Sequence, residues 1–396
     1  MRRWSDWRAQ LLGPGSPLRC GRDDNCCSFE VVIPAKPPCR KTRWQRAGTQ
    51  NWRSVGWALL SLWAVSPAYA ADPLPALGAD ANSTSVSGIS SGAYMAGQYE
   101  IAHSSSVVGA AIIAGGPYGC AEAKYADLMG DAAHLAMNAS QSVSGCMLNA
   151  LSWYGIPDTA ALADRAKDLA ASGKIDPIEN LKKHRIYVFS GLSDQIVAHE
   201  IVVDAAEVYL RLGVPKEKIL TGPRLQAGHG FVTDQQDAGC ALSASPYVVH
   251  CGYDQAGDLL AQIYGTLAPK TGQPAGDLIS FDQRPYGASA NLAPDGAVYV
   301  PAACRKEKGC RVHVAFHGCS QSRDMVGDAF VSGTGFAPWA DANRIIVLYP
   351  QVAADPMSNP LGCWDWWGYT GFGYLTRDAP QIAAVHAMVA KLASKP

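Results

Sequence analysis

The chain has 396 residues, of which 48% are hydrophobic and 17% are charged, and its formal net charge is −1. This balance excludes an intrinsically disordered chain and a protein saturated with membrane-spanning segments. The length is sufficient for one large domain with its own hydrophobic core.

The first 71 residues differ from the rest of the chain. Five Lys and Arg residues between positions 40 and 53 precede an apolar run at 55–65, and Ala68-Tyr69-Ala70 follows. This is the order of a secretory signal peptide with an A-x-A cleavage site. A membrane anchor is the alternative, but the run is well short of the roughly 20 residues that span a bilayer. We therefore predict a leader and signal peptide at 1–71, cleaved near Ala70, and one domain at 72–396 that is secreted or periplasmic.

Removal of this leader changes the charge. Residues 1–71 hold 11 of the 33 Lys and Arg residues and 4 of the 34 Asp and Glu residues, so 22 basic and 30 acidic residues remain, a net charge of −8. Phosphate backbones and anionic lipids repel a negative protein. We expect no nucleic-acid partner and no integral membrane association after cleavage.

The most informative motif is Gly88-Ile89-Ser90-Ser91-Gly92, which lies between an extended Ser/Val stretch and a helical-looking stretch. It has the G-x-S-x-G pattern of a nucleophile elbow, in which glycines permit a sharp strand-to-helix turn that exposes a serine hydroxyl. The same pattern also recurs by chance in loops, so a base, an acid and oxyanion donors must be found elsewhere. The predicted nucleophile is Ser90.

From position 83 onward, apolar runs alternate with helical stretches. The runs that predict parallel strands buried on both faces are 107–114, 185–189 and 218–220, and the stretches that predict helices between them are 159–171 and 199–212. A helix and linker at 253–276 precede a second set of elements: an antiparallel hairpin at 278–286 and 297–300, strands at 311–316 and 345–349, and a helix at 379–392. The alternation predicts an α/β fold, with a mostly parallel central sheet and helices on both faces.

An acid and a base follow the nucleophile in the order Ser, Asp, His. Asp194 comes directly after the predicted strand at 185–189, and His229 lies between glycines after the next strand. An α/β-type serine hydrolase places its acid and its histidine in such loops. The alternatives are that Asp194 is the N-cap of the next helix and that His229 is structural. We predict the triad Ser90, Asp194 and His229.

The oxyanion of an acyl-transfer reaction needs two N–H donors. One is normally the amide of the residue after the nucleophile, here Ser91, because the glycine spacing makes Ser90 the nucleophile. The second usually comes from an HG-type loop that precedes the elbow, but the candidate here, His317-Gly318-Cys319, lies after it. If this loop serves the same site, the fold is circularly permuted. The alternative is an ordinary turn at the end of a strand.

Eight cysteines follow the leader, an even number that suggests disulfides in an exported protein. None has the C-x-x-C spacing of zinc or redox sites, and we predict no metal or organic cofactor. Eight cysteines permit 105 pairings. Our working assignment pairs Cys120 with Cys146, Cys240 with Cys251, Cys304 with Cys310, and Cys319 with Cys363.

Together these motifs resemble a known family. The segments that carry the resemblance are 88–95, 115–120, the Asp194 and His229 loops, 245–247, 317–319 and 359–369, and the last two are the most specific. They are similar to the single-domain poly(3-hydroxybutyrate) depolymerases, which have a circularly permuted α/β-hydrolase fold. The resemblance runs from about Thr84 to the C-terminus. It implies the triad given above, oxyanion amides at Ser91 and Cys319, and a disulfide that holds Cys319.

The expected substrate is a short-chain polyester. The tryptophan cluster Trp364, Trp366 and Trp367 offers rigid apolar area to a methyl-bearing chain, and Tyr118 lies in one of the family motifs. We expect these four residues to contact substrate, although core packing is the alternative for each tryptophan. The chain ends without a separate substrate-binding domain, which favours amorphous polymer or soluble oligomers.

Two other functions stay open. A feruloyl or acetylxylan esterase also uses Ser, His and Asp with an HGC-like loop, and a polymer-binding protein could retain the fold without turnover. The intact predicted triad favours hydrolysis of the ester, and we expect a monomer that acts on a polyester polymer or oligomer.

Overall fold

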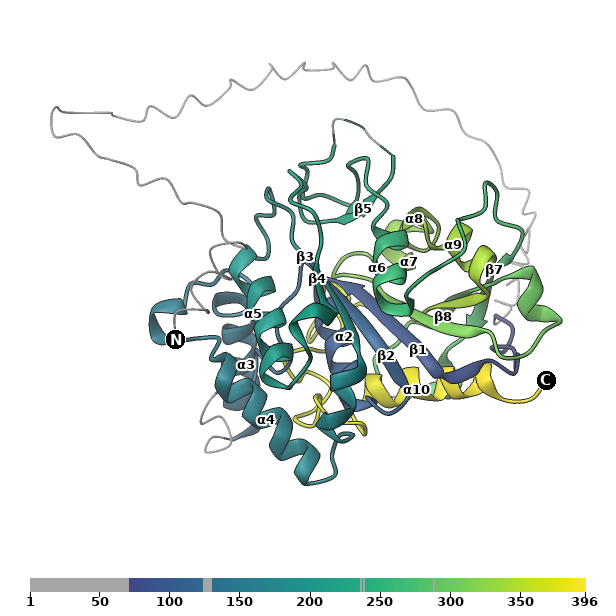
Figure 1. Ribbon diagram of the computed structural model, residues 1–396. Coiled ribbons are helices and arrows are strands. Elements are labelled where there is room, and N and C mark those ends of the chain that lie inside the picture. Colours follow the sequence, from purple (N-terminus) through teal and green to yellow (C-terminus); the bar gives the residue numbers. More distant parts are fainter. Residues whose placement is uncertain (1–70, 124–129, 236, 238, 288) are drawn as a thin grey trace, which may run out of the picture. The chain divides into compact units, whose positions relative to one another are not determined.

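A computed structural model describes residues 71–396, except 124–129, 236, 238 and 288. An eight-stranded sheet with the order β4-β3-β2-β1-β9-β10-β8-β7 forms its centre (Figure 1). The strands are β1 (Asp80–Ile89), β2 (Val107–Ile113), β3 (Arg185–Phe189), β4 (Ile219–Thr221), β7 (Asp277–Asp282), β8 (Asp295–Val300), β9 (Arg311–Phe316) and β10 (Ile345–Tyr349). Neighbouring strands are parallel, except that β8 is antiparallel to both β7 and β10.

Helices cover both faces of this sheet. The longer ones are α2 (Ser91–Ala102), α3 (Asp131–Ser144), α4 (Thr159–Ala171), α5 (His199–Arg211), α6 (Gln255–Tyr264), α9 (Phe336–Asn343) and α10 (Pro380–Ala393), and two short helices are α7 (Arg323–Val326) and α8 (Ala329–Gly333). α2, α5 and α10 pack on one face, and α6 and α9 pack on the other. In the described part of the chain, no helix is long and apolar enough to cross a membrane. The mostly parallel α/β architecture that the sequence predicts is confirmed.

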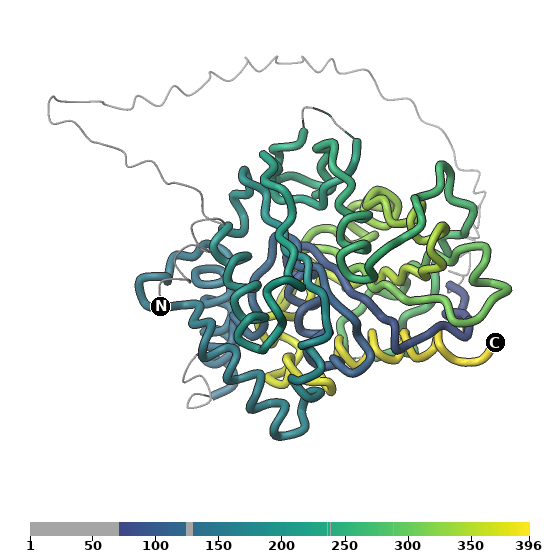
Figure 2. The backbone as a smooth tube through the Cα atoms, in the orientation of Figure 1, coloured from purple at the N-terminus to yellow at the C-terminus, as the bar shows by residue number. Residues whose placement is uncertain are grey.

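The chain order of the strands is permuted. β1 lies in the middle of the sheet and pairs with β2 on one side and with β9, from the last third of the chain, on the other. Figure 2 shows the N-terminal strands, in purple, running beside later segments. Because β9 is parallel to β1, its carboxyl end lies at the same edge of the sheet as the elbow. The circular permutation expected from the displaced HG-type loop is therefore confirmed.

The sequence analysis missed two parts of the fold. One is a small parallel sheet of β5 (Phe231–Thr233) and β6 (Val248–His250), which lies in the segment after His229. The other is α3, whose buried residues are His134, Asn138 and Ser142. A helix that buries polar side chains has no apolar stripe, so hydrophobic periodicity does not reveal it.

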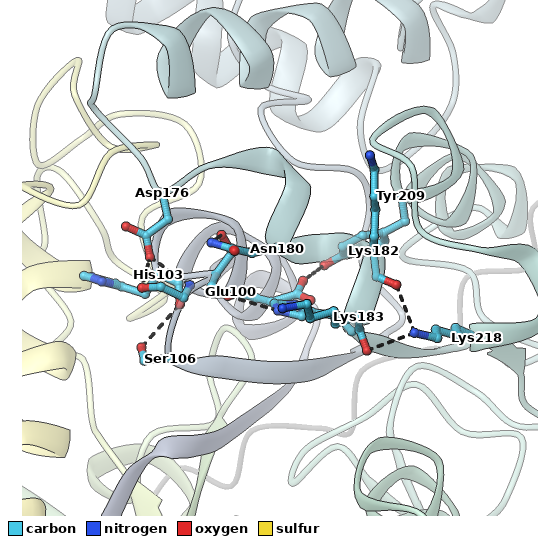
Figure 3. A network of polar contacts seen from close by, with 12 residues as sticks. Glu100, His103, Ser106, Asp176, Asn180, Lys182, Lys183, Tyr209 and Lys218 are labelled. Carbon is cyan, nitrogen blue, oxygen red and sulfur yellow. Dashed lines mark hydrogen bonds and ion pairs between the residues drawn. The ribbon is translucent and has the colours of Figure 1, made fainter.

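A network of polar contacts fixes the C-terminal end of α2 (Figure 3). Glu100 lies near this end and is completely buried, and its carboxylate accepts a hydrogen bond from the Tyr209 hydroxyl on α5. The second oxygen of Glu100 is hydrogen-bonded to His184 Nδ1 at 2.8 Å. Nearby, Asp176 forms an ion pair with Arg377 at 2.8 Å. α2 is thus anchored at the end opposite the elbow.

Four disulfides join the cysteines of this part of the chain. They are Cys120–Cys146, Cys240–Cys251, Cys304–Cys310 and Cys319–Cys363, the same pairs as in our working assignment. The last of them joins the loop after β9 to the tryptophan-containing segment 364–367.

Candidate active site

The elbow between β1 and α2 holds Ser90 in an unusual backbone conformation. Ser90 has φ 57° and ψ −125°, a positive φ that non-glycine residues rarely adopt, and it is the N-cap residue of α2. Its own N–H is held by the Ile113 carbonyl at 2.9 Å. The turn is so tight that a Cβ atom at Gly88 would lie 2.0 Å from the Gly92 carbonyl oxygen. The glycine at this position is therefore a steric requirement of the turn.

Asp194 lies in the loop after β3, where its carboxylate is fixed on both oxygens. Oδ1 accepts hydrogen bonds from the backbone N–H groups of Ile196 at 2.8 Å and Val197 at 3.0 Å. Oδ2 is 2.8 Å from His229 Nδ1, and the two side chains are almost completely buried. The alternative interpretation of Asp194 as a helix N-cap is wrong, because the N-cap of α5 is Ala198.

A neighbouring loop holds the backbone of His229. The His229 N–H donates to Ser243 Oγ at 2.8 Å, and the Gly228 N–H donates to the Cys240 carbonyl at 2.8 Å. The Tyr247 ring contacts the imidazole edge to face, with ring centres 6.1 Å apart. Since Nδ1 faces a carboxylate, it carries the proton in the neutral imidazole, and Nε2 is then free to accept one.

Ser90 and His229 line one cavity of about 450 Å³. Its wall also includes Tyr247, Cys319 and Leu361. Among the hydrogen bonds between described residues, none joins Ser90 to His229. The cavity thus brings the predicted nucleophile and base to one space, with the acid behind the base.

The loop after β9 lies directly beside the elbow. In the β1–β9 register Gly88 is opposite Phe316, and a Cβ atom at Gly318 would lie 3.3 Å from Ser90 Cβ. A Cβ atom at Gly92 would lie 2.4 Å from the carbonyl oxygen of His317. Glycine at positions 92 and 318 therefore allows the loop and the start of α2 to touch, and Cys319 lines the cavity.

His317 fixes this loop from inside the protein. Its Nδ1 donates to the Gly318 carbonyl at 2.7 Å, and its Nε2 accepts from the Val352 N–H at 3.2 Å. Burial lowers the pKa of His317 to about 4, so the imidazole is neutral at pH 7 and can serve both contacts. The amides of Ser91 and Cys319, the two predicted oxyanion donors, do not donate to any other group in the described part of the chain.

Comparisons with known proteins identify the family. No protein-family model matches the chain. A poly(3-hydroxybutyrate) depolymerase of Delftia acidovorans is 36% identical over 342 residues, which cover 85% of this chain and 65% of that protein. A polyhydroxybutyrate depolymerase of Talaromyces funiculosus is also 36% identical over 342 residues, covering 82% of this chain and 94% of the relative. The chain belongs to the poly(3-hydroxybutyrate) depolymerase family.

Solved structures of the depolymerase family share the fold. A PHB depolymerase complexed with an R3HB trimer aligns with a TM-score of 0.72 and 34% identity, over 81% of this chain and 98% of the other. A crystal structure of PHB depolymerase from Penicillium funiculosum aligns with a TM-score of 0.71, at the same identity and coverage. The family resemblance stated from the motifs is thereby confirmed.

Two of the four predicted substrate contacts line the cavity of this depolymerase family member. Trp366 and Trp367 form part of its wall, and their rings meet edge to face with centres 5.9 Å apart. Trp366 also stacks on Tyr94 of α2 at 4.1 Å. The pair thus forms an aromatic wall that is fixed to α2.

Tyr118 and Trp364 are not in the cavity wall, in contrast to our expectation. Trp364 is completely buried and packs edge to face on Phe316 of β9, with ring centres 4.9 Å apart. Tyr118 is 4% exposed and donates its hydroxyl hydrogen bond to the Leu375 carbonyl at 2.7 Å. Both side chains fill the core, and Trp364 does so because neighbouring residues of a turn point in different directions.

The sequence analysis gave no role to two residues near the depolymerase cavity, Tyr247 and Asp365. Tyr247 contacts the His229 ring from a left-handed backbone conformation, with φ 56°. Asp365 is buried and organises the aromatic turn by accepting hydrogen bonds from the N–H groups of Gly368 and Thr370. Burial raises the pKa of Asp365, and these donors oppose that effect. The acidic residue among these aromatic residues is the sequence feature that could have indicated this turn.

Proposed function

We propose that this chain is a serine esterase that hydrolyses poly(3-hydroxybutyrate), related short-chain polyhydroxyalkanoates and their oligomers to 3-hydroxybutyrate units. The observation that carries the proposal is the convergence of Ser90, the Asp194–His229 pair and the loop after β9 on one cavity. The relatives are named for activity on this polymer. Because the chain spans less than two thirds of the Delftia relative, the activity of that protein supports the proposal without establishing it.

The reaction begins with proton transfer. His229 Nε2 accepts the proton of Ser90 Oγ as the oxygen attacks the ester carbonyl carbon. The negative oxygen of the tetrahedral intermediate accepts hydrogen bonds from the amides of Ser91 and Cys319. The C–O bond to the alcohol then breaks, and His229 returns the proton to the leaving oxygen, which leaves an acyl-enzyme on Ser90. Water then attacks the acyl carbon as His229 accepts its proton, and His229 passes this proton to Ser90 Oγ as the C–O bond to Ser90 breaks and the acid leaves. Asp194 holds the imidazole tautomer and stabilises its charged form throughout.

The cavity wall supports a polyester substrate. Apart from His229, the described wall contains no residue that carries a charge, and its apolar part includes Val143, Ile196, Trp366 and Trp367. A methyl-bearing ester chain offers apolar area and carbonyl oxygens, which such a wall accommodates. The wall also contains polar side chains such as Ser142, Ser320 and Asn359, so the choice of substrate rests on the two relatives, which are named for activity on polyhydroxybutyrate. We therefore rank the polyester above a ferulate or acetylxylan substrate.

The cellular setting is also part of the proposal. We propose that residues 1–71 are a leader and signal peptide and that 72–396 are a single catalytic domain, secreted or periplasmic, which acts as a monomer without a cofactor. Four disulfides support an oxidising compartment.

The test compares three substrates and three proteins. Acid release is measured from amorphous polymer granules, methyl ferulate and acetylated xylan, with the wild type, Ser90→Ala and Ser83→Ala. Ser83 lies on the same strand as the elbow but toward its other end, and it serves as the matched control. We expect release from granules that Ser90→Ala abolishes and Ser83→Ala retains.

Each other outcome changes the proposal in a defined way. Release from granules by Ser90→Ala would overturn the nucleophile assignment. Activity confined to ferulate or to acetyl esters would change the substrate. Binding to granules without cleavage of any ester would show a binding protein.

A further inference from the structure

Gln321 joins the loop after β9 to the segment that contacts His229. Its side chain is 1% exposed, and its Oε1 accepts a hydrogen bond from the Gly318 N–H at 2.7 Å. Its Nε2 donates to the carbonyl oxygens of Pro246 at 2.9 Å and Tyr247 at 3.0 Å. One buried amide therefore uses its acceptor on one loop and both donors on another.

At the first end, Gln321 completes the control of the Gly318 backbone. His317 already holds the Gly318 carbonyl, and this carbonyl shares a planar peptide with the Cys319 N–H. Gln321 holds the N–H on the other side of Gly318. Rotation about the two backbone dihedrals of a glycine is otherwise easy. With both flanking peptides held, the direction of the Cys319 N–H is fixed.

At its second end, Gln321 holds the segment around Tyr247 beside His229. The Tyr247 carbonyl that accepts from Gln321 also accepts from the Phe231 N–H at 2.8 Å, and the Tyr247 ring lies against the imidazole of His229. The segment around Tyr247 is thus hydrogen-bonded both to β5, which begins two residues after His229, and to Gln321 in the loop after β9. The distance between the base and the Cys319 amide depends on this connection.

We propose that Gln321 is a positioning residue for the transition state: it holds the Cys319 amide in place relative to His229. This inference rests on the proposed esterase mechanism. A donor aimed at the oxyanion contributes only if its direction is set before the charge develops. Loss of the bridge therefore weakens stabilisation of the tetrahedral intermediate more than binding of the ground-state ester.

The chain offers a control in Gln262 of α6, which packs on the face of the sheet opposite to α2. Its Nε2 donates to the carbonyl oxygens of Ile186 at 3.2 Å and Lys218 at 2.8 Å, so its amide also holds two backbone carbonyl groups. Neither Gln262 nor these two partners belong to the cavity wall. Replacement of either glutamine by methionine removes two amide donors from backbone carbonyl groups, so both substitutions should lower stability.

The experiment measures kcat and KM on p-nitrophenyl butyrate for the wild type, Gln321→Met and Gln262→Met, with melting temperatures recorded in parallel. For Gln321→Met we expect kcat to fall about 10- to 100-fold, which is no more than the fall expected when one oxyanion donor is removed. We expect KM to change less than about twofold. For Gln262→Met we expect kcat within about twofold of the wild type. Equal losses of kcat in both variants, or a rise in KM alone for Gln321→Met, would overturn the proposal.

A second measurement separates transition-state effects from folding. Phenylboronic acid forms a tetrahedral anionic adduct with a nucleophilic serine, and its dissociation constant should rise in Gln321→Met by the same factor as kcat falls. If this variant does not fold, Gln321→Asn keeps a neutral amide that is one methylene too short to reach both loops, and we expect the same direction with a smaller factor. Unchanged boronate affinity in a folded variant contradicts the positioning role.

Failure of the two proposals can be distinguished. If Ser90→Ala still hydrolyses p-nitrophenyl butyrate, the esterase mechanism is wrong. If Ser90→Ala is inactive and Gln321→Met has wild-type kcat, the mechanism stands and the positioning role is wrong.

Discussion

The two halves of the sheet contribute different kinds of group to the site. The segment from β1 to β6 supplies the predicted triad of Ser90, Asp194 and His229, together with the predicted oxyanion donor Ser91. The segment from β7 to α10 supplies the loop after β9, with the second predicted donor Cys319, and the aromatic wall of Trp366 and Trp367. The comparison teaches that the proposed proton chemistry needs one stretch of chain, whereas the proposed oxyanion hole needs both, which meet at the β1–β9 pair.

The largest expected effect lies in the first half. Asp194→Asn should lower kcat by about 10⁴-fold, because an amide no longer holds the His229 tautomer or stabilises the imidazolium. The control is Asp158→Asn, since Asp158 also accepts two backbone N–H groups, from Ala160 and Ala161, but has no histidine partner. Steady-state kinetics on p-nitrophenyl butyrate measure both. A loss below about tenfold for Asp194→Asn would remove it from the triad.

The second largest effect on kcat is expected where the start of α2 meets the loop after β9. In Gly92→Ala the new Cβ atom would lie 2.4 Å from the carbonyl oxygens of Phe316 and His317, so the start of α2 must move away from the loop after β9. We expect kcat to fall by about 10²-fold. Gly97→Ala, on the same helix, is the control, because its Cβ atom would meet its nearest neighbour at 3.5 Å. Similar kinetics of the two variants would contradict the contact.

Two tryptophans in the segment from β7 to α10 should separate an effect on substrate binding from an effect on protein stability. Trp367→Ala should raise KM for soluble oligomers about tenfold, because it removes aromatic area from the cavity wall. Trp364→Ala should instead lower the free energy of unfolding by about 3–5 kcal/mol, since it leaves a void beside Phe316. Kinetics and urea unfolding of both variants test this division. The reverse pattern would mean that Trp364 contacts substrate.

The smallest effect concerns pH. Burial lowers the pKa of His317 to about 4 and that of His313 to about 3, from the usual 6.5. The unfolded chain therefore binds more protons below pH 6.5, so stability present above that pH is lost as the pH falls toward 4 and then 3. At pH 5 we expect a loss on the order of 1–2 kcal/mol for each histidine. Urea unfolding at pH 7 and pH 5 measures it, and His313→Asn should reduce the loss.

The sequence predicts the large sheet well and the cavity wall poorly. Runs such as 345–349 are completely buried, so their apolar character is visible without knowledge of partners. β5 and β6 have three residues each, too few to show a period. The positions of Ser90, Asp194 and His229 could be predicted because each residue follows a predicted strand in the chain. Which of Trp364, Trp366 and Trp367 faces the cavity depends on a turn organised by Asp365, and sequence alone does not give that turn.

The pairing of β1 with β9 has a consequence for synthesis of the protein. β1 is made early, but one of its edges acquires its partner only when the last third of the chain has been made. Until then, that edge exposes unpaired N–H and C=O groups, which invite pairing with other chains. Chains that have not been extended beyond β9 and β10 therefore cannot complete the central sheet. The sheet closes late in synthesis, and a chaperone that shields β1 during this interval should raise the yield of active protein.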